Sequence, residues 1–434
     1  MKTRLLGTLV LGVIVALPST SGAQIILKGV VVVPGNPITS SDISWVDPGT
    51  ERTYVTDRSN FGVDIIDAEN NLFVGRVTGM VGVAGVSDGT HQNNGSGPNG
   101  VFVTNDGFLW AGDGDSKATV ADVNPGSPSY LQIVAQIDTS NAECDDGTDG
   151  GHWCQRLDEG GFDPVDRIVM YANNGPLSPT QLCPTPANPN AHCPVDPYVT
   201  LIDANTYGVL GQIIFPGVTG IEQPLWHAGL GRFLLTVPGS LANNILPSVA
   251  VIDPTTCRSD GGCSVEQQIF LDCMALVGTT SQSVTGIAGA ADRIIVSACG
   301  QGAPLPAVPS FPIILNPYTQ AVVNIVTQVG GGDQVWFNPG DGHFYVTGTD
   351  LTGATGLQSL GAIDAQTGNW LQNITDVRGK NPSAFHENNE VFTVGQITAA
   401  IVANPALDDS VCTQFGWRGL GCIAIFGTEE PEDR

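Results

Sequence analysis

One pattern of four short β-type strands recurs along this chain, and no other feature of the sequence restricts the fold so strongly. Each copy opens with a polar residue and an apolar strand that often ends in Asp-Pro or Asn-Pro. A second strand follows a turn, a third ends in Ile-Asp or a similar pair, and a fourth completes the copy. Residues 51–71, ERTYVTDRSNFGVDIIDAENN, hold the middle strands of the first copy. Copies at intervals of roughly 50 to 60 residues are typical of a propeller or another repeat array.

Seven copies can be traced, and the seventh lacks its fourth strand. Residues 25–35, IILKGVVVVPG, form a strand that precedes the first copy and has no partner there. If the last copy takes up this strand, the ring closes and both open sheet edges disappear. We therefore predict an all-β, seven-bladed β-propeller closed by its N-terminal strand. A pair of β-sandwiches is the structural alternative, although sandwiches do not need such even repetition.

The composition fits a turn-rich β protein with a core. Of the 434 residues, 13% are charged and 41% are hydrophobic, with 55 Gly and 29 Pro. These proportions exclude a disordered chain. Helical signals are scarce, because no long stretch repeats apolar residues at helical spacing.

The first 23 residues are typical of an export signal. A basic start precedes the apolar stretch 5–17, and a small-residue cleavage site ends at Ala23. A membrane anchor is the alternative, but this stretch is too short to cross a bilayer comfortably and no second one follows. We expect a secreted, extracellular or periplasmic protein with no membrane span. Its domains would be the signal (1–23), the propeller (24–428) and an acidic C-terminal tail (429–434).

Cysteine usage agrees with export. The ten cysteines form five close pairs in sequence order: Cys144–Cys154, Cys183–Cys193, Cys257–Cys263, Cys273–Cys299 and Cys412–Cys422. In an exported protein such pairs predict disulfides that staple loops, although spacing alone leaves other pairings open. A zinc site is not expected without a CxxC pair, and no CxxCH motif for covalent haem is present.

The charge balance argues against several partners. With 42 acidic and 16 basic residues, the formal net charge is −26. Such a surface repels phosphate backbones and anionic membranes, so we expect no nucleic-acid partner. The sequence GSGPNG at 95–100 matches a dinucleotide-binding motif but leads into a strand, so no nucleotide cofactor is expected either. An acidic surface attracts metal cations or cationic substrates, and net charge does not select between them.

Aligning the copies places one polar residue from each innermost strand in register around the predicted axis. These residues are Asp42, Asn99, Asp158, Glu222, Thr285 (ambiguous by one position), Asp333 and Asn381. Asp and Asn are depleted in strands, so β propensity does not explain this ring. Converging carboxylate and amide oxygens suit Ca²⁺ or another divalent cation. The alternatives are that these residues cap turns, or that they line a solvated channel.

Three further side chains are candidate ligand contacts together with Asp42 and Asn381 of the ring, and the two arginines among them are expected near the mouth of the channel. They are Arg58, Arg156 and His386. An arginine in so acidic a chain can hold a substrate carboxylate by a bidentate contact. Pairing with a neighbouring Asp is the alternative, and Asp158 stands two residues after Arg156. A histidine here is a candidate general base, although six histidines without metal-ligand spacing are more often structural or surface residues.

Several stretches resemble the YVTN-type β-propeller family. They are YVTDRSN (54–60), GVDIIDAENN (62–71), GPNGVFVTNDGFLWAGDGDS (97–116), IEQPLW (221–226), GGDQVWFNPGDGHFYV (331–346) and AIDAQTGNWLQNI (362–374). The likeness spans nearly the whole mature chain and implies the propeller fold. It implies little about activity, because that family is largely defined by its repeat. The cysteine-rich loops 140–155, 180–196 and 256–274 and the insertion 405–421 depart from the plain pattern.

The ring is also similar to that of the gluconolactonase-like calcium propellers, which set a Glu, an Asn and an Asp around an axial metal. Asn99, Glu222 and Asp333 are similar in type and placement, which implies a metal at these residues. By the same resemblance, the metal would polarise a lactone carbonyl while a carboxylate of Glu222, Asp333 or Asp158 activates water. The other motifs of that family are not evident in this chain.

These patterns favour a secreted propeller that binds a small molecule or a divalent cation in an acidic axial pocket. One alternative is a metal-dependent hydrolase of lactonase or esterase type, or a lyase, at the same pocket. The other is a cell-surface interaction module with a protein partner on the loop-rich face. The enzyme requires several axial carboxylates that converge and leave an open coordination position.

Overall fold

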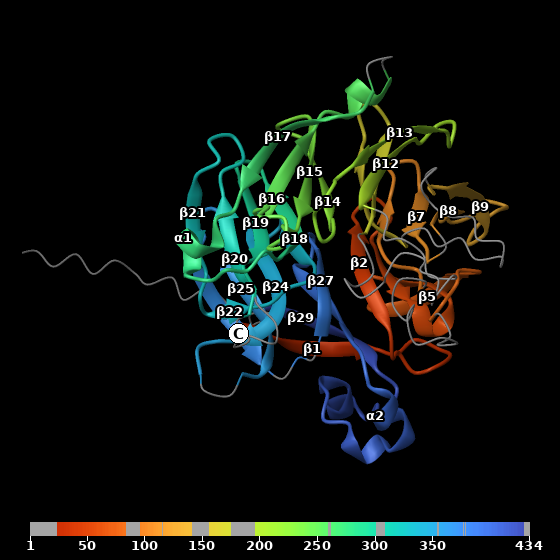
Figure 1. Ribbon diagram of the computed structural model, residues 1–434. Coiled ribbons are helices and arrows are strands. Elements are labelled where there is room, and N and C mark those ends of the chain that lie inside the picture. Colours follow the sequence, from red (N-terminus) through yellow and green to blue (C-terminus); the bar gives the residue numbers. More distant parts are fainter. Residues whose placement is uncertain are drawn as a thin grey trace, which may run out of the picture.

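The computed structural model describes residues 24–83, 96–114, 116–140, 156–174, 196–258, 262–300, 309–353, 356–375, 377 and 379–428. These residues form seven antiparallel sheets arranged as blades around one axis, which confirms the predicted seven-bladed β-propeller (Figure 1). The predicted export signal, the acidic tail and the Cys144–Cys154 and Cys183–Cys193 pairs lie outside the described residues.

The first three blades follow the first three copies of the repeat, each ordered from the axis outward. Blade 1 contains β2 (Ser41–Asp47), β3 (Arg52–Asp57), β4 (Gly62–Asp67) and β5 (Leu72–Thr78). Blade 2 contains β6 (Val101–Val103), β7 (Phe108–Gly112), β8 (Lys117–Asp122) and β9 (Ile133–Asp138). Blade 3 contains β10 (Leu157–Asp163), β11 (Ile168–Asn173), β12 (Tyr198–Asp203) and β13 (Val209–Ile214).

The next three blades repeat this order, with one interruption. Blade 4 contains β14 (Pro224–His227), β15 (Arg232–Val237), β16 (Ser248–Ile252) and β17 (Val265–Phe270). Blade 5 contains β18 (Val284–Ala290), β19 (Arg293–Ala298), β20 (Phe311–Leu315) and β21 (Val322–Ile325). Blade 6 has its innermost strand split in two and contains β22 (Val329–Gly330), β23 (Val335–Asn338), β24 (His343–Asp350), β25 (Gln358–Asp364) and β26 (Trp370–Thr375).

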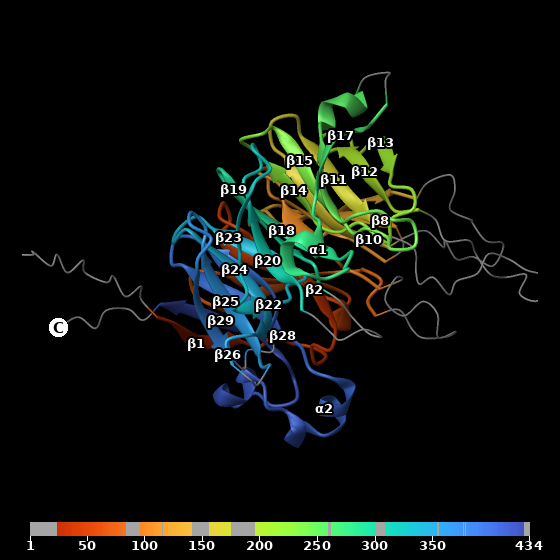
Figure 2. The same ribbon diagram turned by 60° about the vertical axis from the view of Figure 1, so that its left-hand side comes forward.

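Blade 7 closes the ring with strands from both ends of the described chain. It contains β27 (Gly379–Phe385), β28 (Glu390–Gly395), β29 (Cys422–Thr428) and, as its outermost strand, β1 (Ile25–Val31). Strand β1 pairs antiparallel with β29, from Ile25 opposite Thr428 to Val31 opposite Ile423 (Figure 2). The predicted N-terminal closure is therefore confirmed.

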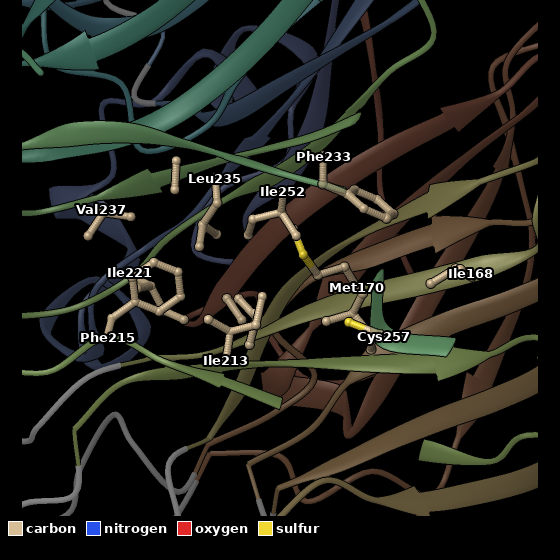
Figure 3. Close-up of a cluster of buried hydrophobic side chains, with 14 of the residues drawn as sticks. Ile168, Met170, Ile213, Phe215, Ile221, Phe233, Leu235, Val237, Ile252 and Cys257 are labelled. Atoms are coloured by element: carbon tan, nitrogen blue, oxygen red, sulfur yellow. The ribbon is translucent and has the colours of Figure 1, made fainter. Parts of the chain in front are cut away.

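Hydrophobic cores lie between neighbouring blades, because residues that alternate along a strand face opposite sides of its sheet. In β15, Phe233, Leu235 and Val237 pack toward blade 3, whereas Leu234 packs toward blade 5. Figure 3 shows the cluster between blades 3 and 4, where Met170 lies beside Ile252. Strands buried on both faces carry continuous apolar runs, which is why the middle strands of each copy are so hydrophobic.

The acidic residues that recur in the repeat hold its turns. At the end of third strands, Asp67 Oδ1 accepts a hydrogen bond from Asn70 N at 2.8 Å, and Asp364 Oδ1 accepts one from Thr367 N at 2.7 Å. At the end of first strands, Asp163 Oδ1 accepts from Val165 N at 2.8 Å. These are Asx turns, so the Ile-Asp and Asp-Pro signals of the sequence have a structural cause.

The described helical segments are short. They are η1 (Arg58–Asn60), η2 (Pro254–Arg258), α1 (Cys273–Val277), α2 (Ala399–Ala403), η3 (Pro405–Leu407) and η4 (Val411–Phe415). The segment that carries α2, η3 and η4 connects β28 to β29 and projects from the propeller (Figures 1 and 2). Within the part of the chain that the structure describes, no helix combines the length and apolar character needed to cross a membrane.

Three of the predicted disulfides are present in the described residues and follow sequence order. They are Cys257–Cys263, Cys273–Cys299 and Cys412–Cys422. Each of them ties a helical segment or loop to its own blade, as stapling disulfides in loop-rich folds do.

Candidate functional site

A β-bulge recurs near the start of the innermost strands and places the predicted ring residues. The pairing register shifts between Ser41 and Ser44, Leu157 and Gly160, Val284 and Ile287, and Lys380 and Ser383. The first residue inside each bulge is Asp42, Asp158, Thr285 or Asn381, so the ambiguous register of Thr285 is resolved at that residue. Bulges re-aim side chains and leave their backbone groups free of the ladder.

The freed groups form hydrogen bonds between blades around the axis. Ile43 N donates to Asn99 O at 3.2 Å, and Gly100 N donates to Asp158 O at 3.0 Å. The side chain of Asn381 links blade 7 to both of its neighbours. Its Oδ1 accepts a hydrogen bond from Gln334 N of blade 6 at 3.2 Å, and its Nδ2 donates to the Asp42 carbonyl of blade 1. The side chain of Asn381 is therefore a structural link in this belt.

Arg58, on η1, lies over the ring between blades 1 and 2. Its guanidinium forms a buried ion pair with Asp42 and also donates to Asn99 Oδ1 and, at 3.2 Å, to Pro98 O. Asn99 is fully buried, and its Nδ2 donates to Leu157 O at 2.8 Å. The predicted alternative, in which Arg58 pairs with an Asp, is the arrangement found.

Lys380 is a ring residue that sequence reasoning missed. Its ammonium lies 2.7 Å from Asp42 Oδ1 and 2.9 Å from Asp333 Oδ2, so it joins blade 7 to blades 1 and 6. Asp42 is buried, whereas the Asp333 side chain is 42% exposed. The two predicted ligand carboxylates therefore share one ammonium.

Arg156 pairs with Asp158 as its position in the sequence predicted. Its Nη2 lies 2.7 Å and its Nε 3.1 Å from Asp158 Oδ2. Asn174 Nδ2 donates to the same oxygen at 2.7 Å. The structure thus brings Asp42, Asp158 and Asp333 to one ring, each beside a basic side chain.

The pKa values of two ring carboxyls, Asp42 and Glu222, are shifted in opposite directions. Burial alone would raise the pKa of Asp42, but the charges of Arg58 and Lys380 outweigh it and hold that pKa well below its ordinary value. Glu222 has no such ion pair with a described residue. Burial and the negative charges of Asp158 and Asp333 raise the pKa of Glu222 well above its ordinary value, against the opposing charge of Arg156.

The arrangement does not fit the metal ligand set predicted from Asn99, Glu222 and Asp333. The Asn99 oxygen accepts hydrogen bonds from Arg58, and the Asp333 carboxylate pairs with Lys380. Among the described residues, no three His, Cys, Asp or Glu side chains gather as metal ligands do. A divalent cation at this ring, and the catalytic roles of Glu222, Asp333 and Asp158 around it, remain untested predictions.

His386 does not join the ring. It follows β27 directly, at the end of that strand opposite Asn381, and its ring contacts Phe385 with centroids 5.7 Å apart. A contact between His386 and a ligand held by the ring residues is not supported by this position.

A cavity of about 310 Å³ lies along the innermost strands directly after the ring, and sequence reasoning missed it. Six of the seven blades supply its walls, which are mainly apolar. The lining includes Ile43, Trp45, Val101, Val103, Glu159, Phe162, Gln223, Leu225, Trp226, Ile287, Val335, Trp336 and Phe337. This volume is at the lower end of the ~300–1,000 Å³ range of small-molecule sites.

Glu159 is the acidic side chain in this cavity wall. It is the second residue of the blade 3 bulge, 6% exposed, and its Oε2 is buried without a hydrogen-bond partner among the described residues. Burial and the negative charges of Asp158 and Glu222 raise its pKa well above the ordinary value. A signal for it did exist in the sequence, since Glu159 directly follows the predicted ring residue Asp158.

The aromatic residues of the cavity wall also form a pattern in the sequence. Apolar residues follow the polar ring residue at nearly constant offsets, and among them are Trp45, Trp226 and Trp336. The periodicity of the sequence identifies such residues as parts of strands and of the core. It does not show which of them line a cavity at the axis. The cavity depends on how six strands from different copies converge.

Comparison with known proteins supports the fold and goes no further. No known protein family matches the sequence, and no curated protein matches it. A chain in the crystal structure of the mitotic checkpoint complex is 11% identical with a TM-score of 0.53, over 91% of this chain and 96% of that chain. The Pan2 WD40 domain of Neurospora crassa is 8% identical with a TM-score of 0.53, over 91% of this chain and 90% of that one.

The class of protein is therefore a seven-bladed β-propeller. Likeness at such low identity carries the fold alone, because one fold hosts many unrelated functions. The fold implied by the YVTN-type resemblance is confirmed, while membership of that family or of the gluconolactonase-like propellers is not shown.

Proposed function

We propose that this protein binds a small organic molecule in the axial cavity. The observation that carries the proposal is the cavity itself, apolar on most sides and bordered by Glu159, which has a buried carboxyl oxygen that is unpaired within the described part of the chain. A largely apolar pocket with few polar groups is the usual form of a small-molecule site, because burial supplies affinity and the polar group supplies orientation.

The ring next to the cavity supports this function by holding the walls. Asp42, Arg58, Asn99, Lys380 and Asn381 bond mainly to one another and to backbone groups of neighbouring blades. A site built on strands tied together in this way keeps its shape without a ligand. Pre-organisation of this kind lowers the entropic cost of binding.

Export of the protein is part of the same proposal. The basic and apolar start of the sequence and three disulfides in the described residues support an oxidising compartment outside the cytosol. A binding protein in that position would meet ligands from the surroundings of the cell.

The test is to fill the cavity and measure ligand binding. A set of small aromatic and aliphatic compounds would be screened by thermal shift against the wild type and Val103→Phe, in which the new ring occupies the cavity. Val322→Phe is the matched control, since Val322 is 40% exposed on the outermost strand of blade 5. We expect hits that stabilise the wild type and the control but not Val103→Phe. Hits that bind all three proteins equally would place the ligand elsewhere.

A hydrolase at the same axis is the second candidate. The raised pKa of Glu222 favours it, because a carboxyl that keeps its proton to a higher pH than an ordinary Glu can act as a general acid. A screen of lactones and esters with Glu222→Gln as the comparison tests this candidate. Turnover by the wild type that persists in the variant would assign the activity to other residues.

Binding of a protein partner on the loop-rich face is the third candidate. The segment between β28 and β29 lies on this face and exposes Leu407, Phe415 and Trp417. Exposed apolar side chains grouped on one segment are typical of contact surfaces.

A further inference from the structure

We propose that the axial cavity takes an organic cation, an amine with a compact apolar body, whose ammonium group contacts the carboxylate of Glu159. The inference rests on the function proposed above and names the chemical class of its ligand. It is carried by three features of the cavity: its one acidic group, its aromatic walls and the charges around it.

Glu159 is placed to receive a donor. Its side chain is 94% buried, it lies in the cavity wall, and its Oε2 has no hydrogen-bond donor within the described part of the chain. Buried carboxyl oxygens are nearly always paired in folded proteins, so an unpaired one on a side chain in the cavity wall marks a position where a ligand donor fits. An ammonium group supplies both the donor and the compensating charge.

The walls suit a cation with an apolar body. Trp45, Phe162, Trp226, Trp336 and Phe337 line the cavity and are each only partly buried. The rings of Trp45 and Trp336 meet edge to face with centroids 5.2 Å apart. Aromatic faces attract cations through their quadrupoles and also cover apolar groups, so one wall serves both ends of such a ligand.

The surrounding charges favour a cation over an anion. The three basic groups of the ring each lie beside an acidic one, Arg58 and Lys380 beside Asp42, and Arg156 beside Asp158. Glu159 has no basic side chain paired with it among the described residues. Burial and the neighbouring acidic groups Asp158, Glu222, Asp333 and Asp42 raise the pKa of Glu159, so these groups favour a positive charge beside it. A field that retains a proton at this carboxyl also attracts an ammonium ion.

Binding should then be linked to a proton. Without ligand, burial and the facing carboxylates named above keep Glu159 protonated to a higher pH than an ordinary Glu. An arriving ammonium displaces that proton, so affinity for amines rises with pH through the raised pKa of Glu159. It falls again only when the amine loses its own proton near pH ~10.

The experiment compares three probes that carry the same phenylethyl group by isothermal titration calorimetry. They are 2-phenylethylammonium, neutral 2-phenylethanol and anionic 3-phenylpropionate, each titrated into the wild type, Glu159→Gln and Glu266→Gln. Glu266 provides the matched control, because it is exposed on the outermost strand of blade 4. We expect the ammonium to bind the wild type and the control at least tenfold more tightly than the alcohol. We expect Glu159→Gln to lose that tenfold preference and to keep a normal melting transition.

The other outcomes separate this inference from the proposed function. If the alcohol or the acid binds as tightly as the amine, or if Glu159→Gln keeps the preference, the cavity binds small molecules but the cation assignment is wrong. If none of the three probes binds the wild type, both the cation assignment and the proposed function of this cavity fail. Proton release measured in two buffers of different ionisation enthalpy gives an independent readout, and its absence would also overturn the inference.

Discussion

Two carboxylates bound to the same ammonium show how much burial decides the role of a residue. Lys380 lies within 3 Å of both Asp42 and Asp333, yet Asp42 is buried and also paired with Arg58, whereas the Asp333 side chain is 42% exposed. Water screens the exposed pair, so it adds little to stability. In the buried pair, removal of one partner leaves a charge that water cannot reach.

We therefore expect Asp42→Asn to lower the free energy of unfolding by about 3 kcal/mol or more at pH 7. Asp333→Asn, the matched change in the more exposed pair with Lys380, should lower the free energy of unfolding by less than about 1 kcal/mol. Because the pKa of Asp42 is lowered in the folded state, its stabilising effect is present above the unfolded pKa of about 4. This effect is lost as the pH falls through the lowered value, so the gap between the wild type and Asp42→Asn should narrow in acid.

Urea unfolding of both variants at pH 7 and at pH 3 measures these differences. Equal losses for Asp42→Asn and Asp333→Asn would show that the ion pair with Arg58 contributes nothing beyond the shared ammonium.

At the scale of elements, the disulfides fix segments that the sheets do not hold. Cys273 on α1 is joined to Cys299 just after β19, and both are almost fully buried between blades 4 and 5. Cys257 on η2 is joined to Cys263 within the connection from β16 to β17 of blade 4. The two bonds close loops of very different length, with sequence separations of 26 and 6 residues.

Loop length predicts unequal losses when these bonds are removed. In the chain-entropy account, replacing both cysteines by Ala costs about 3.5 kcal/mol for Cys273–Cys299 and about 2.2 kcal/mol for Cys257–Cys263. Thermal melts of the two double variants would give the order of the losses. A larger loss from the shorter loop would contradict the entropic account and indicate that local packing at η2 dominates.

At the scale of the whole molecule, closure and the belt of hydrogen bonds around the axis act together. Pairing of β1 with β29 leaves no open blade, and bonds such as Ile43 N to Asn99 O link successive innermost strands. Gln334 even reaches past blade 7, with its Nε2 2.7 Å from Ser44 O. The ring residues thus serve the rigidity of the fold as well as the edge of the cavity.

The structural role of the ring residues affects what we expect of the metal predicted at the axis. Since Asp42, Asp158 and Asp333 lie beside Arg58, Arg156 and Lys380, we expect no stoichiometric divalent cation at the ring. Chelation should leave the melting temperature unchanged. Elemental analysis of the purified protein, with melts before and after chelation, is the measurement. A metal lost together with stability would show that carboxylates outside these pairs assemble a site.

Predictions from the sequence succeeded where the signal was local and repeated. The register of the ring followed from aligning seven copies, and Thr285 was placed within one residue. The metal predicted at the ring stays a prediction, and the sequence did not reveal the partners of Asn99, which are Arg58 of blade 1 and the Leu157 carbonyl of blade 3. Sequence spacing carries no information on such contacts.

The sequence by itself determined the seven-bladed architecture, the N-terminal closure and the polar ring, and it predicted the three disulfide pairs found within the described residues. Each of these depends on a repeat or on neighbours along the chain, so residue order is enough to specify it. Only the tertiary structure decided that Lys380 joins Asp42 to Asp333 and that Glu159 lies in the wall of an aromatic cavity, with its Oε2 unpaired among the described residues. Those features exist only once the ring closes, because closure brings the innermost strands of different blades together at one axis. Six of these strands then line the cavity.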